Sequence, residues 1–263
     1  MPTVAEITAD LAAEHADLER ILEPLSPEQW ALATPSPGWD IADQVGHLAY
    51  FDRTAALAIT DPESFKAQAK AMLDAILDGG TDPTLDEPRS MDAAALMTWW
   101  QQGRRGLIDA AATLGEKDRL PWYGPDMSGK SFLTARLMET WAHGQDVCDT
   151  VGTTREPTDR LRHIAQLGFI TRGWTYANRG LEMPEVAVRV ELSAPSGDTW
   201  TWGDDDAPES VTGSAEDFCQ VVTQRRHADD TALVIKGDAA RDWMTKAQAF
   251  AGGATDGPTA GSF

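Results

Sequence analysis

Apolar residues in the first two thirds of the chain recur three or four positions apart, which is the period of a helix with one buried face. The first run starts directly after Thr3, a good N-cap residue, and predicts a helix over residues 3–23. Five more segments share this period and are predicted to be helices, at residues 40–59, 64–79, 91–114, 131–152 and 161–179.

The period changes to two after Gly180. Apolar and polar residues alternate, which predicts strands at residues 186–194, 199–203, 209–214 and 230–238. Two helices are predicted among them, at residues 214–227 with Ser214 as the N-cap, and at residues 239–252. We therefore expect an α+β fold with a helical bundle at residues 1–182, a small α+β domain at residues 183–251 and a flexible, glycine-rich tail at residues 252–263.

Composition agrees with a globular protein and excludes one class of partner. The chain has 263 residues, 42% of them apolar, which is enough for one large domain or two ordinary ones. Its 42 acidic and 22 basic residues give a net charge of −20. Such a charge repels phosphate backbones, so we expect no nucleic-acid binding.

The cysteines and the N-terminus indicate a cellular compartment. Cys148 and Cys219 lie far apart and form no C-x-x-C motif, so a secreted disulfide scaffold is not indicated. The N-terminal residues lack the basic and apolar regions of a signal peptide, and no stretch of 18 apolar residues exists. We expect a cytoplasmic protein that does not enter a membrane.

The segment METWAHGQD, residues 138–146, carries the most informative polar pattern. Glu139 and His143 are four residues apart and leave one face of the predicted helix one turn apart, so both can bind one metal ion. His47 lies on the second predicted helix, near the edge of the core. If the second and fifth predicted helices face each other, the three residues form a site with an open position, typical of a catalytic metal. This donor set suits zinc, and also iron or nickel.

These residues also have ordinary structural interpretations, which spacing alone leaves open. Glu and His one turn apart are common on helices that bind no metal, and a single histidine near a core is usually only hydrogen-bonded. Asp146, about one turn after His143, is either a surface acid or a hydrogen-bond partner of that residue. We expect Trp39 to pack beside His47.

Two segments carry a family resemblance. GWDIADQVGHLAYFD, which contains His47, resembles the motif around the first metal histidine of the mycothiol-dependent maleylpyruvate isomerase family, part of the DinB-like superfamily. METWAHGQDV resembles the E-x-x-x-H-x-x-D segment of a later helix in that family. The resemblance implies a DinB-like four-helix-type bundle with His47, Glu139 and His143 as zinc ligands.

The last third of the chain is similar to the tail of an actinobacterial metal-binding subfamily. Isomerases of the family carry an SCP-2-like α+β domain there, with an arginine in a W-L-x-G-R type segment that helps to hold substrate or thiol. This chain reads QVVTQRR instead, so the resemblance points to Arg225 or Arg226 and leaves the substrate open. The alternative is a pair of surface arginines near a helix end, where the helix dipole favours positive charge.

We therefore expect a metal-dependent transferase or isomerase that uses a low-molecular-weight thiol, by resemblance mycothiol, against a small electrophilic substrate. The metal would lower the pKa of the thiol, Arg225 or Arg226 would neutralise a substrate carboxylate, and Asp146 is a third candidate catalytic residue. A hydrolase that uses metal-bound water and a non-catalytic metal- or ligand-binding protein stay open as alternatives. We expect a monomer or a homodimer.

Overall fold

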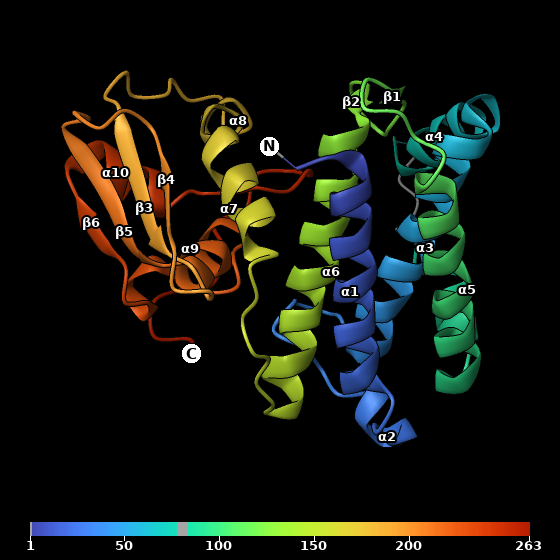
Figure 1. Cartoon of the computed structure of the whole chain (residues 1–263). Helices are drawn as coiled ribbons and strands as arrows, with labels where there is room; N and C mark the ends of the chain where they lie inside the picture. The colour runs from blue at the N-terminus through green and yellow to red at the C-terminus, as the bar shows by residue number, and fades with distance from the viewer. Residues whose placement is uncertain (1, 78–83) are drawn as a thin grey trace. The chain divides into compact units, whose positions relative to one another are not determined.

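The computed structural model describes residues 2–77 and 84–263, which form two compact units that divide between Thr154 and Arg155 (Figure 1). We expected the boundary near residue 182. The difference arises because α7 (Leu161–Ile170), expected to belong to the bundle, packs against a helix of the C-terminal unit, α9 (Ala215–Val222). The apolar side chains on its face, such as Ile164, are buried in that unit.

Among the described residues of the N-terminal unit, four long helices form the bundle, and each packs against two others. They are α1 (Val4–Leu22), α3 (Ile41–Thr60), α5 (Ala93–Ala111) and α6 (Gly129–Val151). Shorter elements connect them: α2 (Pro27–Trp30), α4 (Pro62–Leu77), the 3-10 turn η1 (Pro88–Ser90) and the antiparallel strands β1 (Arg119–Leu120) and β2 (Met127–Ser128). The predicted helical bundle is confirmed, and residues 78–79 of its third predicted helix lie outside the described residues.

Local capping explains where the first two long helices start. The Thr3 side chain accepts a hydrogen bond from the Glu6 backbone, and the Glu6 carboxylate accepts one from the Thr3 backbone. Asp40 and Asp43 form the same reciprocal arrangement at the start of α3. Each arrangement satisfies backbone N–H groups that the helix itself leaves unpaired. The start of α3 fixes the position of His47, which lies two turns further along.

The C-terminal unit is built on a mixed sheet with the strand order β4-β3-β5-β6. Strands β3 and β5 are parallel, and the two outer strands run antiparallel to their neighbours. The strands are β3 (Val188–Ser193), β4 (Thr199–Trp202), β5 (Glu209–Ser214) and β6 (Val234–Lys236). The helices of this unit are α7, α8 (Arg172–Ala177), α9 and α10 (Asp238–Met244), with the 3-10 turn η2 (Ala228–Asp230). The predicted order of strands and helices is confirmed, including Ser214 as the N-cap of α9.

One predicted helix is interrupted and two end earlier than expected, and one of these two is the helix predicted at residues 239–252, which ends at Met244 as α10. The segment predicted as one helix, residues 161–179, is interrupted at Thr171, whose backbone angles, φ of −87° and ψ of 7°, depart from those of an α-helix and separate α7 from α8. Helix α9 stops at Val222, because Gln224 takes a left-handed conformation with φ of 60°.

The C-terminal segment that we expected to be flexible, residues 252–263, makes contacts within its own unit. The Gly261 N–H donates to Asp230 at 2.8 Å, and the Thr255 carbonyl accepts the Gln224 side-chain amide at 2.9 Å. The Phe263 ring lies 4.0 Å from the Arg226 guanidinium. These contacts attach the segment to the C-terminal unit without regular secondary structure. Within residues 2–77 and 84–263, no helix combines the length and apolar character needed to cross a bilayer.

The core of the bundle gives a first testable prediction. Leu48 on α3 is fully buried, whereas Leu32 exposes 43% of its surface. We expect Leu48→Ala to lower the free energy of unfolding by about 2–5 kcal/mol, because it leaves a cavity. Leu32→Ala is the matched control and should stay within about 0.5 kcal/mol of the wild type in urea unfolding followed by circular dichroism. Equal losses in both variants would contradict this core assignment.

Candidate metal centre

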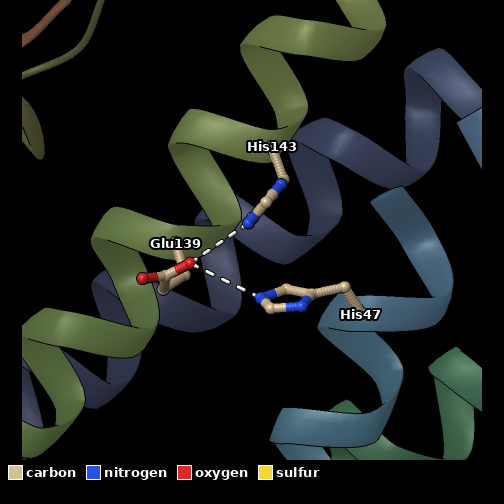
Figure 2. A group of neighbouring side chains, drawn as sticks. All are labelled: His47, Glu139 and His143. Atoms are coloured by element: carbon tan, nitrogen blue, oxygen red, sulfur yellow. Dashed lines mark hydrogen bonds and ion pairs between the residues drawn. The ribbon is translucent and has the colours of Figure 1, made fainter. Parts of the chain in front are cut away.

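Helices α3 and α6 bring the three predicted metal ligands together (Figure 2). His47 comes from α3, and Glu139 and His143 come from successive turns of α6. Glu139 Oε2 lies 3.1 Å from His143 Nε2 and 3.7 Å from His47 Nε2, and one ligand atom from each residue lies within 4.8 Å of the others. The side chains are 11–23% exposed, so the group lies at the edge of the core and within reach of solvent.

The separations fit a single small cation. Two ligands at 2.0–2.1 Å from a tetrahedral ion are roughly 3.3 Å apart, close to the distances of Glu139 Oε2 from the two histidines. Two imidazole nitrogens with one carboxylate oxygen are also the donor types that zinc prefers. Three protein ligands leave a fourth position of a tetrahedral ion open. The residues therefore fit a catalytic rather than a closed structural metal site.

Glu139 is held in its charged form. Burial raises the pKa of this carboxyl, but hydrogen bonds and charge from His143 and His47 outweigh burial and hold the pKa well below its ordinary value. The carboxylate is therefore available as an anionic ligand at neutral pH.

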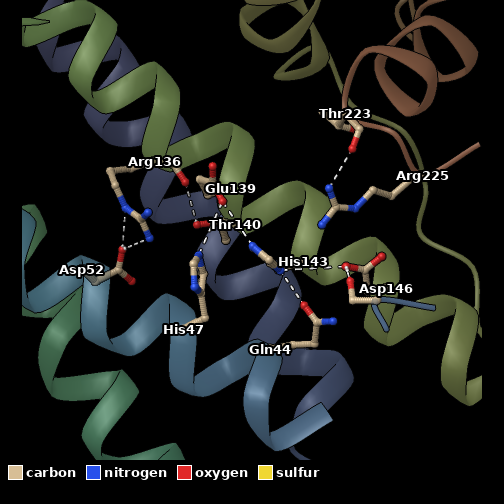
Figure 3. A network of polar contacts seen from close by, with 11 residues as sticks. Gln44, His47, Asp52, Arg136, Glu139, Thr140, His143, Asp146, Thr223 and Arg225 are labelled. Carbon is tan, nitrogen blue, oxygen red and sulfur yellow. Dashed lines mark hydrogen bonds and ion pairs between the residues drawn. The ribbon is translucent and has the colours of Figure 1, made fainter. Parts of the chain in front are cut away.

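A chain of hydrogen bonds fixes the ring of His143, and Figure 3 shows its last contact, between Gln44 and His143. The Thr34 hydroxyl donates to the Trp39 carbonyl at 2.9 Å, so its oxygen accepts from the Gln44 side-chain amide at 2.8 Å. The Gln44 side-chain carbonyl consequently faces His143 Nδ1. Because that carbonyl can only accept, Nδ1 carries the proton. Nε2 donates to Glu139 when the ring is protonated and presents its lone pair to Glu139 when the ring is neutral. A lone pair beside a carboxylate oxygen is an arrangement that a cation stabilises.

Aromatic rings enclose the two histidines. Trp39 stacks on His143 with ring centroids 5.8 Å apart and planes 14° apart, and its centroid lies 5.1 Å from that of His47. Phe51, one turn further along α3, has its centroid 4.6 Å from His47. The expected packing of Trp39 beside His47 is confirmed. These rings limit how far either imidazole can turn.

Asp146 lies on the side of His143 that faces away from Glu139. Its Oδ2 is 3.8 Å from His143 Nδ1 and accepts a hydrogen bond from the Ser36 hydroxyl at 3.0 Å. The carboxyl group is buried. Its location suits a residue that supports His143, and a direct role in a reaction stays a prediction.

Arg225 and Arg226 belong to the C-terminal unit and follow the end of α9. The Arg225 guanidinium donates to the Thr223 carbonyl at 2.7 Å (Figure 3), and that of Arg226 donates to the Arg225 carbonyl at 2.7 Å. Arg226 also lies over the Phe263 ring. Neither residue continues a helix, and their role toward a substrate stays a prediction.

Sequence reasoning missed three buried polar residues around the ligands. Gln44 contacts His143 directly, and Asp52 on α3 pairs with Arg136 on α6 at 2.9 Å (Figure 3). The only sequence signal is a polar residue among apolar neighbours on a predicted inner face, as at Arg136 in TARLMETW. Such a signal does not indicate which residue the polar side chain contacts, because that residue lies on another helix.

The described residues thus form a helical bundle with three convergent side chains of metal-ligand type, followed by a small mixed-sheet unit. Residues 11–148 match the family model for the mycothiol maleylpyruvate isomerase N-terminal domain, which is just over half of the chain. The chain belongs to this family. Residues 184–236 match a second model, described as wyosine base formation, over about a fifth of the chain.

Individual proteins are also similar to this chain. An uncharacterized protein of Mycobacterium tuberculosis, Rv0036c in one strain and MT0041 in another, is 46% identical over 93% of this chain and 95% of its own length. Two crystal structures of a mycothiol-dependent maleylpyruvate isomerase share the fold at 16% identity. A histidine-to-alanine mutant gives a TM-score of 0.58 over 89% of this chain and 93% of its own, and the other structure gives 0.56 over 86% and 90%.

The hydrogen-bond chain through Gln44 predicts the tautomer of His143. In the metal-free protein at a pH where the ring is neutral, nitrogen-15 NMR should find the proton on Nδ1, because Gln44 offers only an acceptor there. Gln44→Leu should populate the Nε2–H tautomer, which can donate to Glu139. Gln101→Leu is the control. It removes a side-chain amide on α5 that donates to Glu19 on α1, and it should leave the His143 tautomer unchanged. An Nε2–H tautomer in the wild type would contradict the assignment.

Proposed function

We propose that the protein is a metal-dependent enzyme that uses mycothiol as a co-substrate and acts on a small electrophilic molecule, as a thiol transferase or an isomerase. The observation that carries the proposal is the convergence of His47, Glu139 and His143 within 4.8 Å at the edge of the bundle core. Zinc is the proposed metal, and nickel and iron(II) are compatible with the same donors.

The three residues would hold the metal with one coordination position left for a ligand from solution. A bound zinc ion supplies a Lewis acid that lowers the pKa of a thiol at that position. Gln44 orients His143 so that its lone pair faces the site, and Trp39 holds the ring from its face. Glu139 contributes the negative charge that offsets part of the charge of the metal.

Family membership supports the choice of thiol. The family takes its name from mycothiol maleylpyruvate isomerase, and the related crystal structures are of a mycothiol-dependent enzyme. In the proposed reaction the thiol loses its S–H proton and its sulfur forms a bond to an electrophilic carbon of an unsaturated substrate, while the carbon–carbon π bond breaks and the neighbouring carbon takes up a proton. A transferase keeps the sulfur–carbon bond, whereas an isomerase breaks it again after the substrate has rearranged and releases the thiol.

Three further residues have proposed roles. Arg225 or Arg226 would pair with a carboxylate of the substrate or of the thiol, because a guanidinium binds a carboxylate through two hydrogen bonds. Asp146 would support the His143 ring from its Nδ1 side, together with Ser36. The different sequence around the two arginines is the reason that no particular substrate is proposed.

Metal content tests the ligand set. We expect His47→Ala, Glu139→Ala and His143→Ala each to lose most of the zinc that the wild type retains after dialysis, because two remaining ligands bind it weakly. His227→Ala is the matched control, since His227 caps η2 in the C-terminal unit, and it should keep wild-type zinc. Elemental analysis of the purified proteins measures the effect. Full zinc content in all three ligand variants would refute the site.

Turnover tests the chemistry. Zinc-loaded protein with mycothiol and a small electrophile, such as an unsaturated carbonyl compound, should give a conjugate or an isomer that chelation of the metal abolishes. Turnover of an ester without thiol would instead indicate a hydrolase that uses metal-bound water. Stoichiometric zinc with neither activity would indicate a metal-binding protein without catalysis.

A further inference from the structure

A buried ion pair joins the two helices that carry the candidate ligands (Figure 3). Asp52 on α3 is completely buried, and Arg136 on α6 is 3% exposed. Arg136 donates to Asp52 Oδ1 from Nε at 3.2 Å and from Nη2 at 2.9 Å. The other carboxylate oxygen lies 3.2 Å from His15 Nε2, so Asp52 also reaches α1.

Three polar contacts between α3 and α6 share one antiparallel register. Along α3, Gln44, His47 and Asp52 follow one another toward the C-terminus. Their partners run in the opposite direction along α6, with Gln44 at His143, His47 at Glu139, and Asp52 at Arg136. The contact between His47 and Glu139 therefore lies between the other two, as Figure 3 shows.

The two contacts on either side of His47 and Glu139 differ in how strongly they oppose a shift of α6 along α3. A shift of α6 by one residue moves each side chain by about 1.5 Å along the axis and about 100° around it, which breaks all three contacts. Gln44 is neutral and can find another partner. Asp52 and Arg136 are charged and surrounded by protein, and separating them leaves two buried charges without compensation, which is strongly unfavourable.

We propose that the Asp52–Arg136 ion pair is a positioning device that fixes the register of α3 against α6 and so brings His47 to Glu139 and His143. Asp52 and Arg136 are positioning residues and do not touch the metal or the substrate. The proposal rests on the proposed function only in that the three ligands bind a metal ion.

A merely stabilising role is the competing explanation. A buried ion pair is weak evidence for stability, because well-packed apolar residues of similar size often replace it at no loss. The effect of the ion pair on register is separate from its effect on stability. Apolar side chains can pack in more than one register, whereas a buried charged pair forms in only one. A variant that keeps stability but lacks the pair therefore separates the two roles.

The test is the double variant Asp52→Leu/Arg136→Met, compared with the wild type and with Glu19→Leu/Arg104→Met. The control removes another ion pair between helices of the same bundle, one that joins α1 to α5, neither of which carries a ligand. Each protein is titrated with Co²⁺, whose visible absorption spectrum reports ligand number and geometry. Thermal unfolding of the metal-free proteins measures stability separately.

We expect the Asp52/Arg136 variant to bind Co²⁺ about 10-fold or more weakly and with an altered spectrum, as residues that support metal ligands do. The Glu19/Arg104 variant should bind within about two-fold of the wild type with an unchanged spectrum. Wild-type affinity and spectrum in a folded Asp52/Arg136 variant would overturn the proposal while leaving the metal site intact. Absence of Co²⁺ binding by the wild type would instead refute the proposed function, and the positioning role with it.

Arg136→Lys provides a second variant in case the double variant does not fold. Lysine keeps the positive charge but lacks the guanidinium that donates from two nitrogens, so folding is retained while the register is held less firmly. We expect a weaker affinity and a broadened or shifted Co²⁺ spectrum in this folded variant. A wild-type affinity and spectrum in Arg136→Lys would overturn the proposal.

Discussion

The packing of α3 against α6 in a single register is the constraint on which the candidate metal centre depends. Within α6, the helical period alone brings Glu139 and His143 to one face. The third ligand, His47, reaches them only through tertiary packing. Burial of apolar residues on α3, such as Leu48, stabilises the packing of the helices, but the hydrophobic effect is non-directional and does not select one alignment of α3 along α6. Polar contacts between defined partners select that alignment.

Local signals made much of the fold predictable. Thr3 and Asp40 cap their helices through groups three residues away, so the sequence alone indicates where these helices start. The spacing of Glu139 and His143 likewise predicted that both side chains leave one face of α6. The partners of Gln44 and Arg136 were not visible, because each lies on a different helix and the contact leaves no periodic pattern. His47 was a candidate third ligand from its position on the second predicted helix, and the resemblance to a family then implied it as a ligand.

The C-terminal unit shows where local signals are misleading. A continuous apolar period predicted one helix over residues 161–179, but the backbone at Thr171 departs from α-helical angles and divides the segment into α7 and α8. Similarly, Gln224 adopts a left-handed conformation that residues other than glycine rarely take, so α9 ends before the two arginines. The unit boundary at Thr154 follows from the packing of α7 on α9, which periodicity cannot reveal.

X-ray absorption spectroscopy at the zinc edge tests the central claim, an open three-ligand centre that accepts a thiol, most directly. Without thiol, the zinc-loaded protein should show only nitrogen and oxygen neighbours at about 2.0–2.2 Å. Addition of mycothiol should introduce one sulfur neighbour at about 2.3 Å. A first shell that already contains sulfur would contradict the account, because the candidate ligand set contains no cysteine. A first shell that mycothiol leaves unchanged would also contradict it, because the thiol would then not bind the metal.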